Sequence, residues 1–130
     1  MSCIEVGAAG MTGEEHERGR SADLRASLRA HEDAAADALN AVVGEGALCA
    51  VARSGQAFPA AKYREGALSA LTEVRRALPP DLSAADTSVV LAVTERWRSR
   101  LLRMRDPGPD WVAYLNGGLD ALQHLVEPRP

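Results

Sequence analysis

The chain has few aromatic residues, few cysteines and almost no lysine. Phenylalanine, tyrosine and tryptophan make up 4% of its 130 residues, so alanine, leucine and valine must build most of the core. Lys62 is the only lysine, and arginine therefore carries nearly all the positive charge. The two cysteines, Cys3 and Cys49, lie far apart and form no C-x-x-C spacing. This pattern predicts neither a disulfide framework nor a zinc site.

Long apolar runs and a basic bias are also missing. No stretch approaches the roughly 18 apolar residues of a membrane span. The start, MSCIEVGAAGM, has neither the basic nor the apolar segment of a secretory signal, and Met11 is a second candidate start. We therefore expect a cytoplasmic protein without membrane association. The net charge of −3 disfavours nucleic acid as a partner, because nucleic-acid-binding domains are normally basic.

Residues 1–20 differ in composition from residues 21–127. The first segment is rich in glycine and contains the charged run GEEHERGR, so we expect a flexible tail that buries little. From Ser21, apolar residues recur three and four positions apart, which predicts an amphipathic helix that ends at the glycines of residues 44–46. The expected apolar face of this helix consists of Leu24, Leu28, His31, Ala35, Leu39 and Val42.

Three more amphipathic helices are expected. One begins at Pro59 and ends before Pro79, because proline suits the first turn of a helix and cannot continue it. The next starts at Ser83, which resembles a capping box together with Asp86 three residues on, and the last begins at Pro109. The expected apolar faces are Tyr63, Ala67, Leu71, Val74 and Leu78; then Val90, Val93, Trp97, Leu101 and Met104; then Trp111, Leu115, Leu119, Leu122 and Val126.

Four helices with mostly short connections predict an all-α, antiparallel four-helix bundle, formed by residues 21–127 as a single domain. The connection between the first two helices is longer and leaves room for a fifth. Alanine-rich faces with few aromatic residues predict a thin core. Because pairing would bury more apolar surface, we expect a homodimer.

The segment NGGLDALQHL contains the pair Gly117 and Gly118. It resembles the phosphopantetheine site of acyl and peptidyl carrier proteins, but Ala121 stands where those proteins have the modified serine. Too few residues follow to complete a carrier bundle, so we exclude that function. Each glycine within a helix costs about 1 kcal/mol relative to alanine. Either the helix breaks here, or the glycines let a second helix or a ligand approach its backbone.

His31 is the candidate centre of a ligand pocket. On an apolar helix face it is either a core histidine bonded to a neighbouring helix or a general base within the bundle. In the second case, the residues expected to bind the ligand are Tyr63, Trp97, Trp111, Tyr114, Gly117 and Gly118.

A metal site would have to use Asp120 and His124, which lie four residues apart. The further ligands would have to come from His31, Asp33 or Asp37. The predicted helices contain no E-x-x-H pair of the kind found in di-iron bundles. We therefore predict no metal and no cofactor.

Arg25 and His31 are separated by five residues. This spacing resembles the signature of HEPN ribonucleases, in which four to six residues separate an arginine from a histidine. Those proteins are also helical bundles. The resemblance covers only these two positions. It implies that paired subunits would use His31 as the acid–base group and Arg25 to bind the phosphate.

The segment TERWRSRLLRMR places five arginines on one expected helix. Arg96, Arg100 and Arg103 flank one side of its apolar face, where their stems can cover the core edge or their charges can bind an anionic partner. We predict an interaction or regulatory module that binds a protein partner through these arginines, without catalysis of its own. The alternative is a small bundle enzyme or ligand-binding protein with a pocket around His31.

Overall fold

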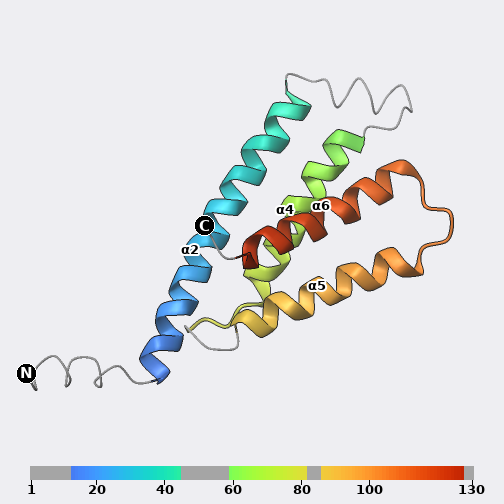
Figure 1. Ribbon diagram of the computed structural model, residues 1–130. Helices are drawn as coiled ribbons and strands as arrows, with labels where there is room; N and C mark the ends of the chain where they lie inside the picture. Colours follow the sequence, from blue (N-terminus) through green and yellow to red (C-terminus); the bar gives the residue numbers. More distant parts are fainter. Residues whose placement is uncertain (1–12, 45–58, 82–85, 128–130) are drawn as a thin grey trace, which may run out of the picture.

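The computed structural model describes residues 13–44, 59–81 and 86–127. Within these ranges the chain forms four helices and no strand, which confirms the expected all-α bundle (Figure 1). The helices are α2 (Gly13–Val43), α4 (Pro59–Ala77), α5 (Asp86–Arg103) and α6 (Pro109–Val126). In the described ranges, every helix is too short or too polar to cross a membrane.

The helices form two antiparallel pairs, one lying across the other (Figure 1). In the first pair α2 runs beside α4, and Glu32 of α2 binds Arg75 of α4 at 3.1 Å. In the second pair α5 and α6 are joined by residues 104–108. The most extensive contact of the bundle is between α4 and α6, which cross near their middles.

The core lies between α4, α5 and α6, and Leu28 of α2 closes one side. Its seven largest fully buried apolar side chains are Trp97, Leu71, Leu115, Leu122, Val74, Val90 and Val93. All seven belong to faces that the apolar periodicity predicts. A single buried tryptophan therefore supplies much of the volume that an alanine-rich chain lacks.

The first helix begins earlier than its apolar pattern indicates. It starts at Gly13 rather than at Ser21, so the whole charged run of residues 13–20, expected to belong to the flexible tail, is helical. Glu15 lies in the first turn, where a carboxylate interacts favourably with the helix dipole. A polar segment can thus extend a helix without burying apolar surface. The connection with room for a fifth helix, Ser83 and both cysteines lie outside the described residues.

The buried face of α6 is rotated relative to the predicted one. Leu115 and Leu122 are buried as expected, and Leu125 joins them. The placement of Trp111 and Val126 on this face is wrong, because their side chains are 54% and 45% exposed. The face turned towards α4 and α5 includes the two central glycines, and this turns the ends of the predicted stripe towards solvent.

Gly117 lies where α6 crosses α4, and the helix is continuous through Asn116–Gly118. A Cβ atom added to Gly117 would lie 2.0 Å from the carbonyl oxygen of Tyr63, and one added to Gly66 would lie 1.9 Å from that of Tyr114. The contact is reciprocal, because each Tyr-x-x-Gly segment places its glycine on the carbonyl of the other tyrosine. Of the three alternatives, the structure shows close approach of a second helix.

Candidate functional site

Trp97 of α5 fills the space that Gly118 leaves open. A Cβ atom on Gly118 would lie 2.3 Å from two carbons of the indole ring. The ring is 1% exposed and stacks on Tyr114, with 5.3 Å between the ring centroids. Its N–H donates to Glu73 of α4 at 3.3 Å, and Glu73 also accepts a hydrogen bond from Arg96 at 2.8 Å. Trp97 therefore joins α4, α5 and α6 and is a core residue.

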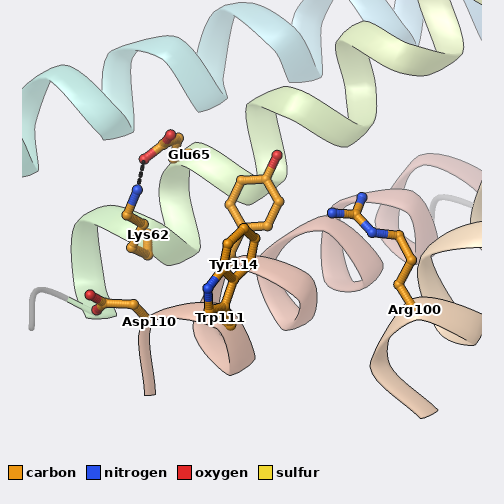
Figure 2. A pocket seen from close by; sticks show the side chains of 6 residues that line it. All are labelled: Lys62, Glu65, Arg100, Asp110, Trp111 and Tyr114. Carbon is orange, nitrogen blue, oxygen red and sulfur yellow. Dashed lines mark ion pairs between the residues drawn. The ribbon is translucent and has the colours of Figure 1, made fainter. Parts of the chain in front are cut away.

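Beside this stack lies a groove with a volume of about 340 Å³, which we call the aromatic groove. It is lined by Lys62, Glu65, Arg100, Asp110, Trp111 and Tyr114. Figure 2 shows Trp111 and Tyr114 in the middle, with Arg100 on one side and the other three residues on the opposite side. The ring of Trp111 meets that of Tyr114 edge-on, with the centroids 5.8 Å apart.

The aromatic groove is lined by two basic residues, Lys62 and Arg100, and by two acidic residues, Glu65 and Asp110. Lys62 and Glu65 neutralise each other through an ion pair at 3.2 Å, drawn in Figure 2. The guanidinium of Arg100 lies 5.1 Å from the centroid of the Trp97 ring and has no carboxylate partner among the described residues. The groove thus combines an exposed aromatic wall with a cation that stacking holds in place.

A second hollow, of about 550 Å³, lies on the exposed side of α5. We call it the arginine face; it is lined by Ala92, Glu95, Arg96, Ser99, Arg100 and Arg103. Arg103, like Arg100, has no carboxylate partner in the described ranges. Two leucines of the same helix, Leu91 and Leu102, are 58% and 78% exposed. Positive charge and apolar side chains are therefore both available to solvent on α5.

Arg25 is held by α5 and by the segment that precedes it. Its Nε and Nη2 donate to the carboxylate of Asp86 at 2.7 and 3.1 Å, and Nη2 also donates to the carbonyl of Pro79 at 2.8 Å. The hydroxyl of Ser21 donates to Asp86 as well. The hydrogen bond to Asp86 raises the pKa of Arg25 above its ordinary value. Arg25 therefore fastens α2 to the first residue of α5.

Asp86 is 1% exposed, and its pKa reflects two opposing effects. Burial raises the pKa of this carboxyl group because it disfavours the charged form. Hydrogen bonds from Arg25 and Ser21, together with the charge of Arg25, outweigh burial and leave the pKa below its ordinary value. Asp86 is consequently a buried carboxylate with its charge compensated. Its expected partner in a capping box, Ser83, lies outside the described residues, so the capping box stays a prediction.

His31 and Arg25 bind different groups. His31 is half-buried on α2, and its Nδ1 lies 2.7 Å from the carbonyl oxygen of Ser27 in the same helix. It is not among the residues that line the aromatic groove. The structure therefore does not assemble Arg25 and His31 into one site on this chain, and catalysis by this pair stays a prediction.

Tyr63 and Asp120 connect α4 to α6 beside the crossing. The hydroxyl of Tyr63 donates to Asp120 at 2.5 Å, and this hydrogen bond, with burial and the charge of Asp120, raises the pKa of Tyr63. His124 is exposed one turn further along α6. Within the described ranges, no three His, Cys, Asp or Glu side chains lie close enough together to hold a metal ion.

The structure divides the expected ligand-binding residues into two groups. Trp111 and Tyr114 line the aromatic groove, whereas Tyr63, Trp97 and the glycine pair lie in contacts between helices. The remaining groove residues, Lys62, Glu65 and Asp110, are missed by the sequence analysis, as is Gly66 at the crossing. The repeated Tyr-x-x-Gly pattern at residues 63–66 and 114–117 is a signal that would have identified Gly66.

Comparison of the chain with models of known families, with curated proteins and with solved structures finds no significant match.

Proposed function

We propose that the protein is an interaction module that binds an acidic segment of a protein partner on the arginine face of α5. The observation that carries this proposal is the exposure of Arg100 and Arg103 without carboxylate partners among the described residues. The chain as a whole has a net charge of −3, so this concentration of positive charge is local.

The chemistry of arginine supports an acidic partner. A guanidinium presents several N–H donors in a plane and can bind a carboxylate through two parallel hydrogen bonds. Ala92 and Ser99 are small and leave a hollow between the arginines into which a peptide backbone can fit. Leu91 and Leu102 offer apolar surface that a partner would bury. The exposed side of α5 therefore offers charge recognition on the arginine face and apolar surface at two leucines outside the hollow.

Three further parts of the proposal come from the sequence analysis. We expect the protein to act in the cytoplasm, as a homodimer, and without catalysis of its own. Residues 26, 30, 34 and 41 are exposed alanines on α2, and they support pairing through a helix other than α5.

Isothermal titration calorimetry with a short peptide of alternating glutamate and serine tests the proposal. We expect the double variant Arg100→Gln, Arg103→Gln to bind this peptide about tenfold more weakly than the wild type, because two exposed ion pairs are lost. Added salt should weaken wild-type binding, since exposed charges are screened.

The matched control is Arg29→Gln, Arg76→Gln, which removes two exposed arginines from other helices and should bind like the wild type. Equal affinity of the α5 variant and the wild type would contradict the proposal. Tighter binding of a single-stranded nucleic acid of the same charge would also contradict it.

A further inference from the structure

We propose that the aromatic groove receives an aromatic side chain of the partner's acidic segment. This inference rests on the proposed function and adds a sequence requirement to it. Arg100 lines both the aromatic groove and the arginine face, so the two hollows meet at this residue. A peptide that lies along α5 can thus extend into the groove without leaving the surface.

The size and walls of the groove fit one large side chain. Its volume of about 340 Å³ is at the lower end of the range for ligand sites. Trp111 is 54% exposed there, and its ring stands edge-on to Tyr114. A guest ring can pack against this pair in the offset or edge-on geometry that aromatic rings prefer. The solvent-exposed part of Trp111 would be buried as a result.

The position of Arg100 adds a requirement for negative charge next to the ring. Its guanidinium stacks on Trp97, which is itself held by Glu73 and Gly118. Because the cation is already positioned, little conformational entropy is lost when a carboxylate binds it. Lys62 is already paired with Glu65, so Arg100 is the cation available to the guest. The occupant that fits is an aromatic residue with a glutamate or aspartate beside it.

A free aromatic acid has the same chemistry as this side chain. A peptide fits better because the arginine face continues past Arg100 to Arg103, beyond the groove. A small molecule confined to the groove would not use Arg103. Dependence of binding on Arg103 therefore separates the two occupants.

The test compares two synthetic peptides that differ at one position, a phenylalanine flanked by glutamates and the same peptide with alanine in its place. The probes also include phenylacetate, and binding is measured by calorimetry on the full chain. We expect the phenylalanine peptide to bind the wild type about tenfold more tightly than the alanine peptide, because a buried ring contributes apolar area. It should also change the emission of Trp111, since the other tryptophan is buried.

The variant Trp111→Ala should reduce the affinity for the phenylalanine peptide to that for the alanine peptide and leave the latter unchanged. Val126→Ala is the matched control, because Val126 is also exposed but lies at the opposite end of α6. Arg103→Gln should weaken both peptides by the same factor.

The groove proposal is overturned if both peptides bind the wild type equally, even when Arg103→Gln weakens both, and the proposed function then stands. Equal binding of phenylacetate and the phenylalanine peptide, independent of Arg103, would show that the groove takes a free aromatic acid and would also overturn it. If peptide binding ignores Arg103 but still requires Arg100, Trp111 and the phenylalanine, the proposed binding on the arginine face fails and the groove proposal stands.

Discussion

Gly66 and Gly117 hold α4 and α6 at a distance that no other residue permits. Any residue with a Cβ atom would place a carbon within about 2 Å of a backbone carbonyl oxygen, at 1.9 Å for Gly66 and 2.0 Å for Gly117. The atom met is backbone, so no side chain can rotate away to relieve the contact. The approach also brings Cα hydrogens towards carbonyl oxygens, a weak interaction that recurs between closely packed helices.

Replacing either crossing glycine by alanine should therefore destabilise the protein. We expect Gly66→Ala and Gly117→Ala each to lower the free energy of unfolding by about 3 kcal/mol, because overpacking outweighs the gain in helix propensity of about 1 kcal/mol. Urea denaturation followed by circular dichroism measures the change. Gly19→Ala is the control: nothing lies within 4 Å of its added Cβ, so this variant should be as stable as the wild type or more stable. A Gly66→Ala variant with wild-type stability would show that the helices can separate freely.

The sequence predicts part of the buried core and misses the residues at the helix crossing. Val90, Val93 and Trp97 are buried as their spacing indicates, because apolar periodicity reports directly on a buried helix face. Gly66 is missed because glycine has no side chain, so it adds nothing to a periodic apolar pattern. Trp111 is misplaced for a related reason: the buried face of α6 includes Gly117 against α4 and Gly118 against α5, and neither adds to an apolar pattern.

The aromatic groove could be predicted only in part. Trp111 and Tyr114 are candidates from their residue type, but Lys62 and Glu65 lie on α4 and Arg100 on α5. Their meeting depends on the angle at which α4 and α6 cross. Local sequence patterns indicate helices and their faces, whereas a crossing angle depends on contacts between segments far apart in the chain.

At the scale of elements, the ion pair between Arg25 and Asp86 joins α2 to the start of α5. The side chain of Asp86 is almost fully buried, while that of Arg25 is 21% exposed. The pKa of Asp86 is lower in the folded protein than its ordinary value. This carboxylate therefore contributes stability that is fully present above its unfolded-state pKa and is lost as the pH falls through its folded-state pKa.

Asp86→Asn should remove this contribution. We expect the variant to lose about 3 kcal/mol at neutral pH, because one partner of a buried charge pair is neutralised. The stability of the wild type should fall below about pH 4, where an unfolded aspartate takes up a proton, and the variant should lack this component of the acid transition. Urea midpoints measured across this range test both statements. Asp33→Asn, at an exposed position of α2, should behave like the wild type, and an identical pH profile for Asp86→Asn would contradict the argument.

At the scale of the whole molecule, the proposed homodimer requires a surface on which two copies of the chain can pack. Two of the exposed alanines of α2, Ala26 and Ala30, line a hollow of about 560 Å³ together with Asp23, Leu24, Ser27 and Leu125. Small side chains allow the axes of two helices to come close together. Because these alanines lie on α2, pairing of copies and binding of a partner on α5 would use different helices.

Sedimentation equilibrium should therefore show a homodimer for the wild type. Ala30→Arg should give a folded monomer, because Ala30 is exposed and a long charged side chain would block close approach of a second helix. Gln123→Arg, which adds the same side chain at an exposed position of α6, should remain dimeric. A wild-type monomer, or a dimer that persists in Ala30→Arg, would show that the alanines of α2 do not form the interface.

The crossing of α4 and α6 also limits how this chain can evolve. A larger residue at Gly66 would push the helices apart, and this movement would disturb the contact at Gly117 and the position of Tyr114 in the groove wall. Lineages that keep this packing should therefore keep both glycines, whereas the exposed arginines of α5 can change with the partner. Two Tyr-x-x-Gly segments on helices separated by one other helix would then mark distant relatives even after the rest of the sequence has diverged.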